Sequence, residues 1–220
     1  MRVRDVMTTD LVIVEPDMPI FQAQKLMREK KVRKLLVVNK GRLVGMVTHD
    51  LFMEVSPSKA TGFSVQEMHY LLTAVKVKEV MDKNPVTVSP DMPFEDALNL
   101  GQQRGNAGFP VLENGELVGI ITNGDIIRLL STFLGLGETG VRITIEGLGA
   151  RLGELNMIIS ICDRHKASIL SLMTRLRRET QDLIAVMRLK VKDATALVKD
   201  LSSSGFNLTY VSEPLPSEAA

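Results

Sequence analysis

Two polar residues, Thr122 and Asp125, lie where a predicted strand meets a predicted helix. Residues 117–121 are apolar and partly β-branched, as in a buried strand, and a helical pattern starts at Asp125 after the breaking pair Asn123-Gly124. The first turn of a helix has unpaired N–H groups that suit a phosphate, and a carboxylate there can accept hydrogen bonds from sugar hydroxyls. The same two residues could instead be an N-cap and its capping-box partner, which needs no ligand. The spacing alone leaves both interpretations open.

Other residues that could form a catalytic or metal centre are few. Cys162 and His165 are three residues apart on one face of a predicted helix, but a structural zinc site needs four ligands and the sequence has no second pair. It also has no Ser-His-Asp spacing and no Gly-x-Gly-x-x-Gly sequence. We therefore expect a protein that is not an enzyme and that uses no metal or catalytic cofactor.

A basic cluster, Lys30, Lys31, Arg33 and Lys34, stands just before a predicted strand. Cations are favoured at helix C-termini, so the cluster could be a solvated helix end.

Charge and composition exclude several classes of partner. Lysine plus arginine number 27 and aspartate plus glutamate 26, so the net charge of +1 gives no long-range attraction to nucleic acid or to an acidic membrane. No apolar run approaches the roughly 18 residues of a membrane span, and the first ten residues lack the apolar core of a signal peptide. The single cysteine excludes an internal disulfide. We therefore expect a cytoplasmic protein with no nucleic-acid or membrane partner.

The chain contains an internal repeat, in which residues 74 positions apart match without a gap, for example Gly45 with Gly119 and Thr48 with Thr122. Each copy predicts the order strand, helix, strand, strand, helix, and a Pro-Asp-Met-Pro turn opens its first helix. Two such copies most simply bury their cores by packing as a pseudo-twofold pair. The expected elements are strands 12–14 and 86–88, helices 20–30 and 94–104, and strand pairs 35–38 with 43–47 and 109–112 with 117–121.

A different pattern follows the repeats. Gly135, Gly137 and Gly140 suggest a flexible hinge. The order strand, helix, strand, strand, helix, strand then predicts a ferredoxin-like split βαβ unit. Its elements are expected at 141–145, 154–165, 168–176, 183–191, 194–203 and 207–211.

The fold class expected is therefore α/β (α+β), with two repeats and a smaller C-terminal unit. Between the repeats, Ser64 and Glu67 form a capping-box pattern for a connector helix at 65–75. The expected segments are a first repeat at 1–55, a connector at 56–76, a second repeat at 77–134, a hinge at 135–140, a third domain at 141–212 and a tail at 213–220.

Several short motifs in the two repeats resemble those of CBS domains, and their pairing resembles a Bateman module. The motifs are VRDVM and VKEVM at the start of each copy, the PDMP turns, GFPV at 108–111 and LVGIITNGD at 117–125. This resemblance implies an adenosine-containing regulatory ligand, such as AMP, ADP, ATP or S-adenosylmethionine, between the repeats, with Thr122 and Asp125 holding its phosphate and ribose. CBS domains often have phosphate-binding cations just before the strand expected here at 35–38, so the resemblance implies such a role for the basic cluster, best for Arg33 and Lys34, as an equal alternative to a solvated helix end. The nucleotide-binding residues that it implies are Thr8, Val12, Val32, Arg33, Lys34, Thr48, Ile120, Thr122, Gly124 and Asp125.

The first copy departs from this pattern, because Leu51 stands where the second copy has Asp125. A hydrogen bond to a charged group is worth about 1.5–3 kcal/mol, so its loss weakens a site about 10- to 100-fold. We therefore expect one competent and one vestigial site. Asp50 could still reach a ribose if its helix began one residue earlier.

The third unit resembles an ACT domain, a family in which the turn after the first strand, Asp-x-Pro-Gly-x-Leu, binds an amino acid at a dimer interface. Here the aspartate, proline and glycine are replaced by Gly147, Gly149 and Ala150. A purely dimerising domain is therefore an alternative to an amino-acid site. The loop that would bind the ligand or form the dimer contains Leu148, Gly149, Ala150, Arg151 and Leu152.

The order of the three domains resembles that of acetoin utilisation protein B-type regulatory proteins. The resemblance implies a homodimeric sensor of adenine nucleotides that regulates an enzyme the sequence does not identify. The alternative is a ligand-free dimeric scaffold.

Overall fold

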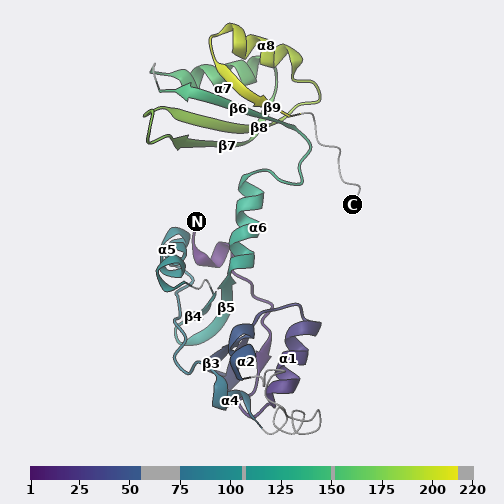
Figure 1. The fold of residues 1–220 in the computed structure, drawn as a ribbon, viewed down its shortest axis with the longest axis vertical. Helices are drawn as coiled ribbons and strands as arrows, with labels where there is room; N and C mark the ends of the chain where they lie inside the picture. The colour runs from purple at the N-terminus through teal and green to yellow at the C-terminus, as the bar shows by residue number, and fades with distance from the viewer. Residues whose placement is uncertain (56–74, 106–107, 150–151, 213–220) are drawn as a thin grey trace. The chain divides into compact units, whose positions relative to one another are not determined.

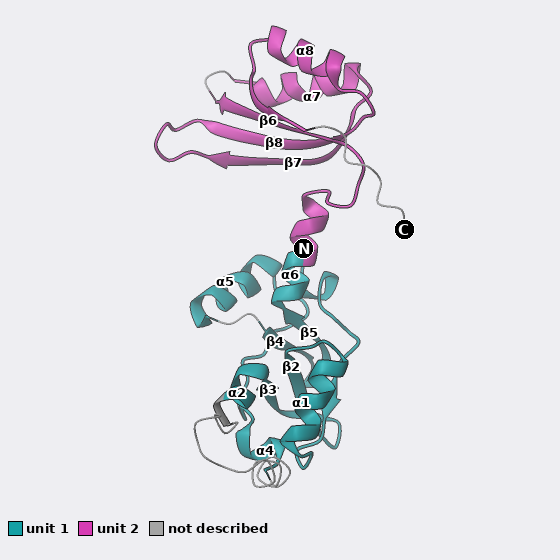
Figure 2. Ribbon diagram, turned by 45° about the vertical axis from the view of Figure 1, so that its right-hand side comes forward, with its two compact units in different colours: residues 1–127 teal, residues 128–220 magenta. Residues whose placement is uncertain are grey.

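The structure, a computed structural model, describes residues 1–55, 75–105, 108–149 and 152–212. It divides into two compact units, Met1–Ile127 and Arg128–Ala220 (Figure 2). The boundary falls within helix α6 (Asn123–Phe133), ahead of the glycines at 135–140. Most of the predicted connector, residues 56–74, and the predicted tail lie outside the described residues.

The first repeat is a short sheet with helices packed against it (Figure 1). Strand β1 is parallel to β2, and β2 is antiparallel to β3, as the predicted order requires. Ala23 and Met27 of α1 are buried with Leu35 and Val37 of β2. The apolar face of the helix, with its spacing of four residues, therefore packs on the apolar face of the strand, with its spacing of two. The elements are η1 (Val3–Asp5), β1 (Ile13–Val14), α1 (Ile20–Glu29), β2 (Lys34–Asn39), β3 (Arg42–Thr48) and α2 (His49–Val55).

The second repeat confirms the predicted helix and the predicted strand pair, but the strand expected at 86–88 is wrong. Only Val88 forms a bridge, to Val111. In the first repeat the Leu36 N–H donates to the Val12 carbonyl, whereas the matching position in the second repeat is Pro110, which has no N–H to donate. The elements are α4 (Val77–Val80), α5 (Phe94–Arg104), β4 (Gly108–Glu113), β5 (Glu116–Thr122) and α6.

Each repeat is completed by the first residues of the other. Thr8 of the first repeat forms an antiparallel bridge with Ile120 on β5, and Asp82 of the second repeat forms the matching bridge with Met46 on β3. The 74-residue offset relates the two bridges, so the exchange is reciprocal. The pseudo-twofold pair predicted from the repeat is therefore held by main-chain pairing as well as by side-chain packing.

A glycine stands at each of these crossings. A Cβ atom on Gly45 would lie 2.6 Å from the Met81 sulfur, and one on Gly119 would lie 2.5 Å from the Met7 sulfur. Both glycines lack a side chain where the other repeat's segment crosses. The Gly-x-x-Thr spacing common to both copies thus has a packing role.

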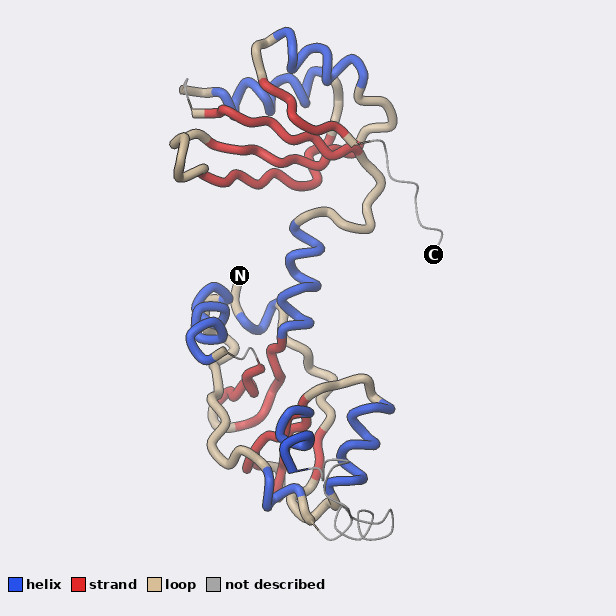
Figure 3. The backbone as a smooth tube through the Cα atoms, in the orientation of Figure 1, coloured by secondary structure: helices blue, strands red, loops and turns tan. Residues whose placement is uncertain are grey.

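The C-terminal unit is a four-stranded antiparallel sheet with both helices on one face (Figure 3). The strand order is β7-β8-β6-β9, and the predicted sequence of elements is confirmed. The first strand is longer than predicted, because its pairing with β8 continues to Leu148 across a bulge after Ile145. The elements are β6 (Val141–Leu148), α7 (Glu154–Arg164), β7 (Ser168–Leu176), β8 (Leu183–Lys190), α8 (Thr195–Ser203) and β9 (Asn207–Val211).

The glycine-rich segment after α6 is a hydrogen-bonded turn. The Gly135 N–H donates to Thr132, and the Gly135 carbonyl accepts a 2.6 Å hydrogen bond from the buried guanidinium of Arg188 on β8. A Cβ atom on Gly140 would lie 2.3 Å from the carbonyl oxygen of Leu189. The turn and the strand after it therefore pack closely on β8.

Candidate functional site

The junction of β5 and α6 is built around the Asp125 carboxylate. The strand runs through Thr122 and the helix begins at Asn123, so the separate Asn-Gly turn expected from the sequence is wrong. Asp125 is 2% exposed and accepts hydrogen bonds of 2.7 Å from the Thr122 N–H and hydroxyl and from the Thr8 hydroxyl. The bond to the Thr122 N–H is half of a capping box, which lets the strand pass directly into the helix.

The matching junction of the first repeat has no such carboxylate. Helix α2 begins at His49, the counterpart of Asn123, so the helix does not begin a residue earlier as the alternative for Asp50 required. The Thr48 hydroxyl instead accepts the N–H of Leu51 at 3.3 Å. Asp50 is exposed and pairs with Arg33 at 3.1 Å.

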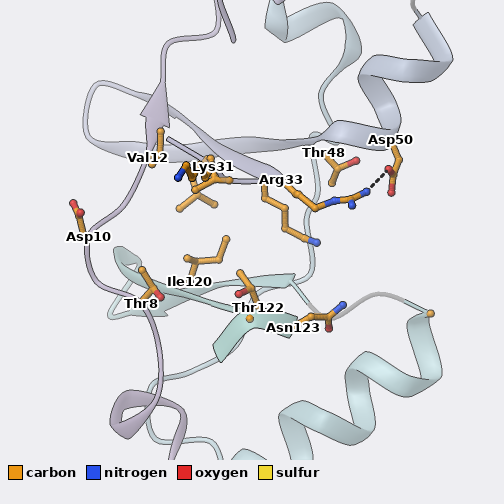
Figure 4. A pocket seen from close by; sticks show the side chains of 15 residues that line it. Thr8, Asp10, Val12, Lys31, Arg33, Thr48, Asp50, Ile120, Thr122 and Asn123 are labelled. Carbon is orange, nitrogen blue, oxygen red and sulfur yellow. Dashed lines mark hydrogen bonds and ion pairs between the residues drawn. The ribbon is translucent and has the colours of Figure 1, made fainter. Parts of the chain in front are cut away.

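A cavity of about 630 Å³ lies between the two repeats, beside the start of α6. In Figure 4, Lys31, Arg33 and Thr48 of the first repeat face Ile120 and Thr122 of the second across it. Of the ten nucleotide-binding residues expected from the sequence, all but Asp125 line this cavity. They are Thr8, Val12, Val32, Arg33, Lys34, Thr48, Ile120, Thr122 and Gly124.

The lining includes two chemically different groups of residues, in addition to the carboxylates of Asp10 and Asp50. One is an apolar wall formed by Val12, Val32, Leu36 and Ile120. The other, which we term the cationic wall, is formed by Lys31, Arg33 and Lys34. Burial lowers the pKa of Lys34, an effect that Arg33 adds to and the carboxylate of Asp50 opposes. The cavity can therefore accept a flat apolar group and an anionic group in the same ligand.

The repeats match the family model for the CBS domain at residues 3–57 and 77–132, about half of the chain. The chain belongs to the CBS-domain family. Its two matched segments coincide with the two repeats, so the repeats form a CBS pair, or Bateman module.

Curated relatives carry this CBS pair in two settings. The CBS domain-containing protein YhcV of Bacillus subtilis is 32% identical over 125 residues, which are 56% of this chain and 81% of YhcV. Homoserine O-acetyltransferase of Methanohalobium evestigatum is 31% identical over 133 residues, which are 60% of this chain but only 24% of the enzyme. The pair thus occurs both as most of a small protein and as a minor part of an enzyme.

Among solved structures, the fold is similar to that of a Vibrio cholerae protein described as an acetoin utilization protein (AcuB). The TM-score is 0.52 at 23% identity, and the match covers 62% of this chain and 94% of that one. At this identity the similarity concerns the fold of the CBS pair.

Sequence reasoning missed several residues that line the cavity of the CBS pair. Asp10 and Gly105 had no distinguishing motif, although Gly105 has the positive φ (64°) of a helix-ending glycine. The sequence predicts Asn123 in a turn, Asp50 as a ribose acceptor only, and Lys31 as a member of the basic cluster. The lining residues outside the expected set are Asp10, Lys31, Leu36, Asp50, Gly105 and Asn123.

The loop after β6 differs from an open ligand site. The side chain of Leu148 is buried in the core, and the Gly149 N–H donates to the carboxylate of Glu154 at the start of α7. Leu152 is fully exposed. The other two loop residues expected from the sequence, Ala150 and Arg151, lie outside the described residues.

The pair Cys162 and His165 is divided between two environments. Cys162 is buried in the core of the C-terminal unit, whereas the His165 Nε2 atom lies 3.0 Å from Asp200 on α8. In the part of the chain that the structure describes, no group of three or more candidate ligands could hold a metal ion. The described helices are all too short or too polar to cross a membrane.

Proposed function

We propose that the CBS pair is a regulatory module that binds an adenosine-containing nucleotide, such as AMP, ADP, ATP or S-adenosylmethionine, and that the protein is not an enzyme. The observation that carries this proposal is the cavity between the repeats, which combines an apolar wall with a cationic wall. Its volume of about 630 Å³ is within the range of about 300–1,000 Å³ typical of small-molecule sites.

The two walls suggest how the ligand lies. The adenine ring would pack on the apolar wall, and the phosphate would lie between Lys34 and the first turn of α6, where Asn123 and Gly124 line the cavity. Helix α6 has 11 residues, and the buried carboxylate of Asp125 in its first turn offsets the partial positive charge of its N-terminus, so Lys34 supplies the positive charge for the phosphate.

The ribose role of Asp125 remains a prediction, because its carboxylate is buried and bonded within the protein. A ribose hydroxyl would have to displace the Thr8 hydroxyl, which is the bond that comes from the other repeat. In the first repeat Leu51 offers no such acceptor, so we expect the related site to be the weaker one.

Isothermal titration of the full chain with AMP, ATP and S-adenosylmethionine tests this function. We expect at least one of them to bind with a 1:1 stoichiometry per chain. The absence of heat from all three at millimolar concentration would contradict it. The alternative is a ligand-free scaffold. Its support is that Asp125 already accepts hydrogen bonds within the protein, and the same titration distinguishes a scaffold from a nucleotide-binding module.

For the C-terminal unit we propose an ACT domain that pairs two copies of the chain, so that the whole has the domain order of acetoin utilisation protein B-type regulators and acts inside the cell. Support comes from its strand order and from β9, an edge strand in which four of five residues are exposed. Pairing is favoured over amino-acid binding because Glu154 already accepts the Gly149 N–H. Light scattering should give twice the chain mass of 24.3 kDa, and a monomer would contradict this.

A further inference from the structure

The side chain of Lys34 crosses from the first repeat onto the second. A Cβ atom built on Gly108 would lie 1.9 Å from Lys34 Cε and 2.6 Å from its Nζ atom. The lysine therefore occupies the space that any other residue at position 108 would fill. Lys34 also lines the cavity, so this crossing belongs to the candidate site.

The crossing breaks the symmetry of the repeats. Position 108 is the counterpart of position 34, so the lysine of one copy lies on the glycine of the other. At the other close crossings the two copies match, since a methionine lies over Gly45 and another over Gly119. The lysine at this crossing comes from the first repeat, and the second repeat has a glycine at the matching position.

The ammonium group is carried toward the start of α6. Gly108 is the first residue of β4 and pairs with Thr122, the last residue of β5 and the residue before α6. A half-buried ammonium and a helix N-terminus thus lie on the same side of the cavity. The buried carboxylate of Asp125 already offsets the partial positive charge of this helix N-terminus, so the ammonium of Lys34 is the group here that favours an anion in the cavity.

We propose that Gly108 is a positioning residue for Lys34, and that this lysine holds the anionic group of the cavity's ligand against the second repeat. The inference rests on the proposed function for its nucleotide, but it concerns an anion of the phosphate class. Because Gly108 has no side chain, Lys34 can lie across it, and the ligand's anionic group then contacts residues of both repeats.

Gly108→Ala is a sharp test because it leaves every charge in place. The added methyl group meets the far end of a flexible side chain, so Lys34 can move aside at little cost to the fold. We expect AMP to bind at least about 10-fold more weakly to this variant, as for the loss of one charge-assisted hydrogen bond, while adenosine affinity is unchanged. Equal AMP affinity in the variant and the parent would overturn the inference.

A double-mutant cycle distinguishes repositioning of Lys34 from a general disturbance. In a Lys34→Ala background Gly108→Ala should have no further effect on AMP affinity, because there is no side chain to displace. In a Lys31→Ala background, which removes the same charge elsewhere on the cationic wall, the effect should persist. If Gly108→Ala weakens AMP binding by the same factor in the Lys34→Ala background as in the parent, the inference is also overturned.

Inorganic pyrophosphate separates this inference from the nucleotide proposal. If no adenosine compound binds but pyrophosphate raises the melting temperature of the parent and not of Gly108→Ala, the anion site stands and the nucleotide function fails. If AMP binds the parent and Gly108→Ala equally well, the nucleotide function stands and the role of Gly108 fails. If the parent binds neither pyrophosphate nor any of AMP, ATP and S-adenosylmethionine, both fail.

Discussion

Replacing Asp125 with alanine tests whether the carboxylate at the start of α6 holds the fold together. The substitution removes three hydrogen bonds of 2.7 Å to a buried charge, one of them from Thr8 of the other repeat. The two hydroxyl donors can turn to other acceptors, whereas the Thr122 N–H is fixed at the end of β5. One buried unsatisfied donor costs about 1–3 kcal/mol, and the lost bond to Thr8 adds about 1 kcal/mol.

We therefore expect Asp125→Ala to lower the free energy of unfolding by about 3 kcal/mol, and the melting temperature of the CBS pair by about 10 °C. Denaturant unfolding followed by circular dichroism measures the first quantity, and calorimetry the second. Thr8→Ala removes only the bond between repeats and should cost about 1 kcal/mol.

Asp50→Ala is the matched control, because it removes a carboxylate at the start of α2 that is 78% exposed and pairs only with Arg33 and His49 among the described residues. An exposed ion pair contributes about 0–1 kcal/mol, so this variant should melt close to the parent. An Asp125→Ala protein with an unchanged melting temperature and no AMP binding would refute the structural reasoning and favour the ribose role.

Three further predictions concern the cationic wall and the C-terminal unit. Raising the salt concentration from about 0.05 to 0.5 M should weaken AMP binding several-fold and leave adenosine binding unchanged, because screening acts on the phosphate; equal salt dependence in titrations of both would contradict it. Because Arg177 holds the pKa of Asp182 well below its usual value, this pair stabilises the unit fully above about pH 4 and less as the pH falls further. Melting curves of Arg177→Met between pH 2 and 7 should thus show a smaller acid-induced loss of stability than the parent, and identical losses would exclude the pair as their cause. Gly140→Ala would place a methyl group against the backbone of Leu189 and should destabilise the unit by about 1–3 kcal/mol in denaturant, a cost that an unchanged midpoint would disprove.

The sequence repeat predicted much of the fold because its pattern is local. The strand that ends at Thr48 and the one that ends at Thr122 each pass directly into a helix, so a gapless alignment placed Leu51 opposite Asp125 correctly. The strand expected at 86–88 does not form because its partner would be Pro110, which has no N–H to donate. This could be predicted from the sequence only if the pairing partner were already known.

The site was less predictable because its decisive contacts are long-range. Asp125 accepts a hydrogen bond from Thr8, 117 residues away, and no local sequence pattern predicts that this hydroxyl donates to the carboxylate. The crossing of Lys34 over Gly108 likewise depends on how two repeats pack, although each residue stands in a recognisable motif. The family resemblance can predict which residues line the cavity, but not which of them already form hydrogen bonds with the other repeat.

The exchange of first residues between the repeats means that the CBS pair has the geometry of a domain-swapped dimer within one chain. The pairs Thr8 with Ile120 and Asp82 with Met46 are the contacts that two identical single repeats would make if each lent its first residues to its twin. Two identical repeats paired in this way would have two equal sites. In a single chain the two halves can differ, and they do so at Asp125 with Leu51 and at Lys34 with Gly108.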